Sequence, residues 1–257
     1  MTYDDYKVFV DMAADNGIEY YLIDGGWNHG SITDLAARSS VRLGELAAYA
    51  ASRNVGLILW VGANQFCAYD MERVCRDFSA LGIKGFKVDY WEHDNQKMMK
   101  LMEDATAMAA KYNLLIDFHG CTKPTGLSAK YPNEVSREGI KGMENFFYNT
   151  NNYKDIAYAL STLTFVRGLA GHGDWTPLIH DGFGLAATLL TDSPLSTISA
   201  DPKELVAHPA KDFLKQLPAS FDKTTVLPYS EFGKCIAMAK EKDESANAEA
   251  TPEDGEK

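Results

Sequence analysis

The stretch GIKGFKVDYW, residues 82–91, carries the pattern that predicts the fold of this chain. An apolar strand pattern leaves a glycine turn and ends on one carboxylate, Asp89, and a helical pattern follows at residues 95–112. In a (β/α) barrel the catalytic groups lie at the C-terminal ends of the strands, so this order of elements points to a functional Asp89. A solvated aspartate that caps the next turn is the simpler alternative.

Short apolar runs alternate with helical patterns along most of the chain. Helices are predicted at residues 2–16, 43–53, 71–81, 95–112, 153–165, 182–191 and 203–217, the last interrupted at Pro209. Strands are predicted at residues 18–23, 55–61, 83–89, 114–118, 139–146, 166–169 and 195–199, and a loop is predicted at residues 121–138. Short apolar strands joined by helices are typical of parallel βα units whose sheet is buried on both faces.

The number of strands predicts a particular α/β fold. Seven strands after a helical start indicate a (β/α)8 barrel of the TIM type that lacks its first strand in this chain. An open doubly wound sheet is the alternative. Because no Gly-x-Gly-x-x-Gly turn follows any predicted strand, a dinucleotide-binding fold has no support.

Composition excludes several classes of partner. The chain has 257 residues, 46% of them hydrophobic, and a formal net charge of −11, of which residues 240–257 contribute seven acids against three lysines. An acidic chain argues against nucleic acid as a partner, and the absence of a long apolar run argues against a membrane. The four cysteines have neither metal-site spacing nor a disulfide framework. The N-terminus lacks the basic and apolar regions of a signal peptide.

Polar and aromatic side chains lie at or near the ends of the predicted strands. In a parallel barrel these ends converge on one rim, so groups far apart in the sequence become neighbours. We expect the rim to include Asp24, Trp27, Trp60, Asn64, Asp89, Trp91, His119, Glu144, Asp174 and Trp175. Lys87 is two residues before Asp89, so both side chains share one face of their strand. The four tryptophans favour a surface that stacks on sugar rings, with packing in the core as the alternative.

Two glutamates of the segment REGIKGMEN are candidate metal ligands. Glu138 and Glu144 bracket a short glycine-containing strand predicted within residues 139–146, and Ca²⁺ takes several oxygen ligands in irregular geometry. A surface ion pair is the alternative for Glu138. His119 reads either as a site residue or as a core histidine, and zinc is not favoured without a second His or Cys nearby.

Several of these runs together resemble glycoside hydrolase family 97. They are YYLIDGGW (20–27), GIKGFKVD (82–89), DFHGCTKPTGL (117–127), KYPN (130–133), REGIKGMEN (137–145), DWTP (174–177) and LPASFDKT (217–224). The resemblance covers most of residues 2–239. It implies a family consisting largely of bacterial α-glucosidases and α-galactosidases with a calcium ion in the active site. Its catalytic barrel lies between an N-terminal β-sandwich and a C-terminal β-domain.

The resemblance implies roles for individual residues. Retaining members place an aspartate nucleophile where Asp89 stands, whereas inverting members carry a glutamate base where Gly120 follows His119. The chain therefore resembles the retaining, α-galactosidase-like branch. Glu144 matches the general acid/base, and Glu138 with Glu144 matches calcium ligands. The implied substrate-binding residues are Asp24, Trp27, Trp60, Lys87, His119 and Asp174.

The resemblance also implies a domain organisation and a location. The catalytic barrel would occupy residues 1–217 and the start of a truncated β-domain residues 218–239. Residues 240–257 lie outside the resemblance, and their composition indicates an acidic low-complexity tail. The substrate would be an oligosaccharide or α-galactoside, and the location periplasmic or secreted. Three alternatives stay open: an α-glucosidase of the same family, a catalytically incomplete sugar-binding barrel, and a calcium-dependent enzyme of other chemistry that uses Asp24, Asp89 and Glu138 as ligands.

Overall fold

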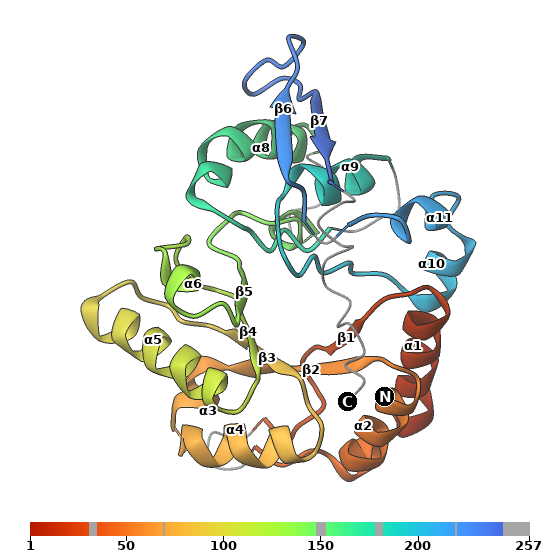
Figure 1. Cartoon of the computed structure of the whole chain (residues 1–257), viewed down its shortest axis with the longest axis vertical. Coiled ribbons are helices and arrows are strands. Elements are labelled where there is room, and N and C mark those ends of the chain that lie inside the picture. The colour runs from red at the N-terminus through yellow and green to blue at the C-terminus, as the bar shows by residue number, and fades with distance from the viewer. Residues whose placement is uncertain (31–34, 69, 148–152, 178–181, 219, 244–257) are drawn as a thin grey trace, which may run out of the picture.

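A parallel five-stranded sheet forms the centre of the structure (Figure 1). The computed structural model describes residues 1–30, 35–68, 70–147, 153–177, 182–218 and 220–243. The strands run in sheet order as β1 (Tyr20–Ile23), β2 (Gly56–Gly62), β3 (Gly85–Asp89), β4 (Leu115–Phe118) and β5 (Glu134–Arg137). Each connection between them carries at least one helix, as expected of parallel βα units. The structure therefore confirms an α/β fold with a parallel sheet.

The first helix, α1 (Tyr3–Asp15), begins with a capping box between Thr2 and Asp5. The helices within the sheet region are α2 (Leu43–Ser52), α3 (Ala63–Ala68), α4 (Met71–Ala80), α5 (Gln96–Lys111), α6 (Leu127–Lys130) and the 3₁₀ helix η1 (Ser39–Val41). Figure 1 shows α1, α2, α4 and α5 arranged around the outside of the strands. The later helices are α7 (Glu144–Phe147), α8 (Tyr153–Val166), η2 (Gly168–Ala170), α9 (Gly182–Leu190), α10 (Pro202–Ala207) and α11 (Lys211–Leu214).

The main core lies between the sheet and these outer helices. All five residues of β3 are buried, and α5 covers the sheet with buried Met102, Ala105 and Ala109. Apolar burial on both faces keeps the strand ends in place. The predicted helices at residues 2–16, 43–53, 71–81 and 95–112 are confirmed to within two residues, as is the interruption of the helix predicted at 203–217.

The fifth strand lies earlier in the chain than predicted. The loop predicted at residues 121–138 contains both α6 and β5, and no strand forms at residues 139–146, where α7 begins at Glu144. The strand sequence EVSR has polar residues at three of four positions, which reads as a loop. Its two charged residues pair in the interior, with Arg137 Nε donating to Glu134 Oε1 at 2.6 Å. Because these charged residues are buried as an ion pair, the strand has no hydrophobic pattern by which the sequence could predict it.

Two further predicted strands are wrong. Residues 166–169 end α8 and begin η2, and residues 195–199 contain no named strand of the structure as described. The chain nevertheless continues beside β5, because the Asp174 N–H donates to the Arg137 carbonyl at 3.2 Å. The Gly173 N–H donates to Asp192 in turn. Single backbone hydrogen bonds of this kind attach the chain to the β5 side of the sheet, but they do not form a regular strand.

The C-terminal part of the described chain ends in an antiparallel hairpin. Strands β6 (Lys223–Val226) and β7 (Met238–Glu241) pair with each other and project from the rest of the molecule (Figure 1). Most of the acidic tail predicted at residues 240–257 lies outside the described residues. All four cysteines are free. Among the described helices, none is both long and apolar enough to cross a bilayer.

Candidate active site

The carboxylate of Asp89 is held at the C-terminal end of β3. The indole Nε1–H of Trp60 donates to Oδ2 at 2.9 Å, and the Tyr90 N–H donates to Oδ1 at 2.6 Å. The side chain of Trp60 reaches Asp89 because β2 lies beside β3, with Trp60 in register with Lys87. Both oxygens therefore have fixed donors, although the residue is only 7% exposed.

A second carboxylate lies beside the buried Lys87. The ammonium Nζ is 3.3 Å from Oδ2 of Asp24, which follows β1 and has an exposed side chain. Burial alone lowers the pKa of Lys87, but the nearby carboxylates of Asp174 and Asp24 outweigh burial and raise the pKa above its ordinary value. Lys87 is therefore a fixed positive charge at the centre of several acids.

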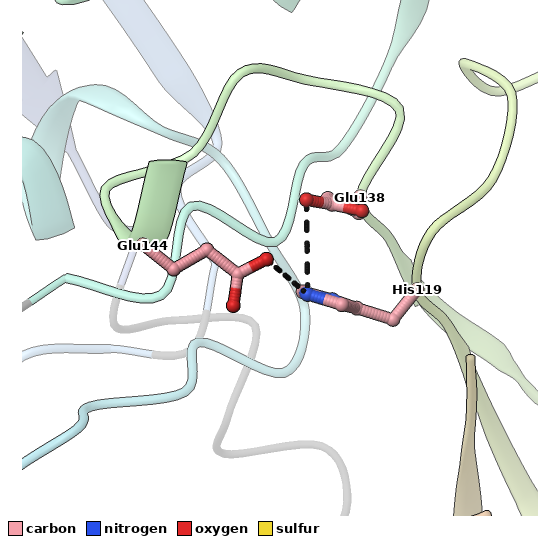
Figure 2. Close-up of side chains that lie close together, drawn as sticks. All are labelled: His119, Glu138 and Glu144. Carbon is pink, nitrogen blue, oxygen red and sulfur yellow. Dashed lines mark hydrogen bonds and ion pairs between the residues drawn. The ribbon is translucent and has the colours of Figure 1, made fainter. Parts of the chain in front are cut away.

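The imidazole of His119 joins three carboxylates from different parts of the chain. Two of them, Glu138 and Glu144, are drawn with the ring in Figure 2. Its Nδ1 lies 3.1 Å from Asp174 Oδ2, and its Nε2 lies 3.0 Å from Glu144 Oε1 and 3.7 Å from Glu138 Oε1. Burial alone lowers the pKa of His119, but its hydrogen bonds to Asp174 and Glu144 raise that pKa to about 11. The ring is therefore an imidazolium that donates from both nitrogens.

The three acids around His119 differ in their proton affinity. The hydrogen bond from His119 lowers the pKa of the half-exposed Glu144. Burial raises the pKa of Asp174, but the hydrogen bond from His119 and the charge of Lys87 together outweigh burial and lower that pKa to about 2. Burial raises the pKa of Glu138, and the nearby Glu144 charge adds to this increase. Carboxylates whose environments separate their pKa values in this way are typical of acid–base sites.

Gly120 connects the Asp89 group to the His119 group. Its N–H donates to Glu138 Oε2 at 2.6 Å, and its backbone has a φ of +52°. A Cβ atom at this position would lie 2.5 Å from Asp89 Oδ1. Only glycine allows Asp89 and Glu138 to pack against the two sides of this turn. The two groups therefore form one continuous rim.

Comparison with known proteins places this rim in a family. Residues 1–140, more than half of the chain, match the sequence profile of glycoside hydrolase 97. The chain belongs to glycoside hydrolase family 97. A retaining α-galactosidase of Bacteroides thetaiotaomicron is 34% identical over 92% of this chain and 39% of its own length. A probable retaining α-galactosidase of Streptomyces bingchenggensis is 30% identical over 86% of this chain and 36% of its own length.

Solved structures of the family share the fold. The crystal structure of a β-arabinopyranosidase has a TM-score of 0.83 and 29% identity, covering 94% of this chain and 42% of the other. A family 97 enzyme of Pseudoalteromonas in complex with acarbose has a TM-score of 0.84 and 23% identity, covering 95% of this chain and 44% of the other. The chain thus spans about two fifths of the length of these relatives.

The structure brings most of the predicted site residues of this family 97 chain to the rim. Asp24, Trp60, Lys87 and Asp89 lie around the ends of β1, β2 and β3, and Glu138 follows β5. Glu144 was expected at the end of a strand, but it lies in the first turn of α7. It reaches the rim because its carboxylate is bound by His119.

Other predicted site residues are buried below the rim. Trp27 is fully buried, with its ring against Phe78 and its Nε1–H on the Trp60 carbonyl, so we do not retain it as a sugar-stacking residue. Trp91 and Trp175 are buried as well, which leaves Trp60 as the tryptophan at the rim. His119 and Asp174, 3% and 2% exposed, bind each other, so they support the site from below instead of contacting a sugar.

Among the described residues, one cluster of side chains could hold a metal ion, namely His119 with Glu138 and Glu144. The alternative set of Asp24, Asp89 and Glu138 does not form such a cluster, because Asp24 binds Lys87 and Asp89 binds Trp60. A calcium enzyme built on that alternative set has no support in this family 97 chain.

Sequence reasoning missed Asp117. This aspartate of β4 is 1% exposed, and burial together with the Asp174 charge raises its pKa well above the ordinary value. Its signal in the sequence is its position two residues before His119 on a strand, which places both side chains on one face. Asp117 therefore extends the buried network beneath the rim.

Proposed function

We propose that the chain is the catalytic barrel of a retaining α-galactosidase. The observation that carries this proposal is the placement of Asp89, which is fixed by Trp60 and packs against Gly120, whose N–H donates to Glu138 of the Glu138–His119–Glu144 group. A retaining glycosidase needs a nucleophilic carboxylate and a second carboxyl group as acid/base about 5–5.5 Å apart. The two curated relatives with this name support the same activity.

Asp89 and Glu144 would act in two displacements. In the first, an Asp89 oxygen forms a bond to the anomeric carbon while the bond to the leaving oxygen breaks, and Glu144 gives its proton to that oxygen. In the second, Glu144 takes a proton from water, the water oxygen bonds to the anomeric carbon, and the bond to Asp89 breaks. The anomeric configuration is inverted twice and so retained.

The protonation of Glu144 depends on substrate. In the free site, the hydrogen bond from His119 lowers the pKa of Glu144 and favours its ionised form. A sugar placed over this half-exposed carboxylate would remove water from it, and desolvation raises the pKa of a carboxylic acid. We infer that substrate binding prepares Glu144 as the acid, and that His119 stabilises the carboxylate formed after proton transfer.

Asp24 and Trp60 are proposed to bind the sugar, with the buried Lys87 in support of Asp24. Asp24 has an exposed carboxylate that can accept from sugar hydroxyls, and Lys87 holds it in place. The half-buried ring of Trp60 lies edge-on to Tyr90, with centroids 5.6 Å apart. Aromatic faces and fixed carboxylates are the usual partners of a small polar ligand.

Glu138 and Glu144 are proposed to hold a calcium ion. Their carboxylates converge on one point beside His119, and two facing acids suit a hard divalent cation. Because Ca²⁺ takes oxygen ligands, His119 would orient Glu144 without binding the ion. Ca²⁺ takes 6–8 oxygens, of which these two residues supply part. When bound, the ion would supply positive charge beside the leaving oxygen.

Calorimetry should show calcium binding that Glu138→Gln weakens at least tenfold.

The proposed activity is tested by the first product and by rescue. NMR of freshly hydrolysed aryl α-galactoside should show the α-anomer of galactose first. Asp89→Gly should abolish turnover, and added azide should restore it with a β-galactosyl azide as product. Asp94→Gly, in the exposed loop that follows β3, is the matched control and should keep full activity. An α-azide product, or an active Asp89→Gly variant, would exclude the retaining mechanism.

A second candidate substrate is a β-arabinopyranoside. The β-arabinopyranosidase structure is more similar in sequence to this chain than the other reported structure is, 29% against 23% identity. The L-arabinose form of this sugar has the ring configuration of an α-galactoside but lacks its hydroxymethyl group. The ratio of kcat/KM for the two aryl glycosides decides between them. Turnover of an aryl α-glucoside alone would indicate the α-glucosidase alternative, and sugar binding without turnover an incomplete site.

We propose that the sheet belongs to a (β/α)8 barrel whose first strand would pair with β1. β1 is the edge of the five-stranded sheet, and a groove of about 610 Å³ lies along it, lined also by α1 and residues 191–200. Extending the chain with the residues that precede the matched region in the Bacteroides relative should place a parallel strand there and raise Tm. A structure in which the added segment lies elsewhere would exclude this proposal. We retain residues 1–217 and 218–239 as the proposed barrel and the start of a β-domain.

A further inference from the structure

Arg167 is a buried cation that lies between α8 and η2, close to the candidate site but not in it. Its side chain is 7% exposed, and in the described part of the chain its hydrogen bonds go to backbone carbonyls. A buried guanidinium is costly unless its N–H groups are all used, and Arg167 uses all three nitrogens. Such an arrangement fixes the backbone that it binds.

The carbonyls bound by Arg167 belong to two separate segments. Nη2 donates to Arg137 at 3.1 Å and Glu138 at 2.7 Å, and Nε donates to Gly139 at 2.7 Å. On the other segment, Nη1 donates to the Gly171 carbonyl at 3.0 Å, and Nη2 donates to the His172 carbonyl at 2.9 Å. One planar group therefore ties the end of β5 to residues 171–172.

Both segments carry side chains of the candidate site. The first contains Glu138, and the second leads to Asp174, which holds Nδ1 of His119. A direct bond between the segments, from the Asp174 N–H to the Arg137 carbonyl, lies next to the guanidinium. Gly139 and Gly171 have φ values of +42° and +122°, so both segments turn sharply at bound carbonyls.

We propose that Arg167 is a positioning residue of the candidate site. Its hydrogen bonds set the spacing between Glu138 and Asp174. These two carboxylates in turn fix the orientation of His119 and, through it, of Glu144. The effect of Arg167 on catalysis rests on the proposed function, whereas its effect on the two backbone segments does not. Lysine cannot replace it fully, because an ammonium is a point donor and cannot span carbonyls on two segments.

The first test measures amide hydrogen exchange by NMR. Arg167→Met removes all donors at similar length, and we expect the Asp174 and Gly120 amides to exchange at least tenfold faster. The amides of β2 and β3 should change by less than twofold. Ala109→Gly, in the buried face of α5, is the control for general destabilisation and should not single out Asp174 and Gly120. Unchanged exchange at both amides, or equal acceleration across the sheet, would overturn the proposal.

The second test uses catalysis and the conservative variant. Arg167→Lys should give intermediate exchange rates and, on an aryl α-galactoside, lower kcat about tenfold with KM changed less than threefold. A wild-type chain without turnover would contradict the proposed activity, while the exchange result would still decide the role of Arg167. If the Arg167→Met variant does not fold, two other measurements test the proposal. They are the amide exchange rates of the Arg167→Lys variant and the exchange rate of the Arg167 Nε–H in the wild-type protein. Fast exchange of that N–H would overturn the proposal.

Discussion

At the residue scale, the site depends on the absence of one side chain. Gly120 lies between Asp89 and Glu138, and any Cβ there would also lie 2.9 Å from the Tyr90 nitrogen. Tyr90 itself donates to Asp89, so a larger residue displaces both the carboxylate and its donor. The separation of the two acids is therefore controlled by a backbone position.

Replacing Gly120 with alanine should reduce activity more than stability. We expect kcat/KM on an aryl α-galactoside to fall at least a hundredfold, because the added Cβ pushes against Asp89 Oδ1. Gly17→Ala is the matched control: its φ of +69° gives similar backbone strain, but nothing lies within 4 Å of the added atom. Each variant should lose about 1 kcal/mol of stability for this strain. Equal activities in the two variants would contradict the steric explanation.

The pH dependence should differ between free and bound enzyme. The hydrogen bond from His119 lowers the pKa of Glu144 in the free site, so the protonated acid is lost as pH rises through the acidic range. The basic limb of kcat/KM, which reports the free enzyme, should lie at lower pH than the basic limb of kcat. Coincident limbs in the two profiles would show that substrate does not raise this pKa.

At the element scale, the close approach of β3 to β4 holds Asp89 and His119 together. Gly85 begins β3, and a Cβ there would lie 2.5 Å from the Leu115 carbonyl oxygen of β4. The neighbouring pair Val88 and Phe118 brings the two strand ends into register. The site therefore depends on a glycine contact at the opposite end of the strand pair.

Two glycine-to-alanine substitutions should have opposite effects on stability. Gly85→Ala should lower the free energy of unfolding by about 1–3 kcal/mol, because the added atom meets backbone that cannot rotate away. Gly44→Ala, within α2, meets only Leu81 at 3.7 Å and should raise stability by up to about 1 kcal/mol through helix propensity. Urea denaturation gives both values. A stabilising Gly85→Ala would show that the strands can separate without cost.

At the scale of the whole molecule, the sheet has an open edge. β1 pairs with β2 on one side, and the groove that contains Leu22 lies on the other. Unpaired strand edges promote association between molecules. The hairpin of β6 and β7 offers a second exposed edge, since all four residues of β6 are exposed.

The chain should self-associate through the β1 edge. We expect light scattering to show a mass that rises with concentration, and Leu22→Lys to restore the monomer because a charge in the groove opposes strand pairing. Val226→Lys, on the exposed hairpin, is the matched control and should leave association unchanged. Loss of association in Val226→Lys alone would place the contact on the hairpin. A wild-type monomer at all concentrations would contradict the prediction.

The sequence by itself determined the elements that have regular patterns. Periodicity located β1 to β4 and the helices around them, because apolar burial on a parallel sheet leaves a local signal. It also placed Asp89 at a strand end and singled out Glu138 and Glu144 as a pair. It misplaced β5, whose charged residues pair with each other in the interior.

Tertiary structure alone decided how these residues work together. Only packing shows that Trp27 is buried while Trp60 reaches Asp89, since both follow similar strand patterns. Only packing brings Asp174 beneath His119, 55 residues apart in the chain. The physical reason is that hydrophobic periodicity reports burial of nearby residues, whereas hydrogen bonds between distant segments depend on how the chain closes around the sheet.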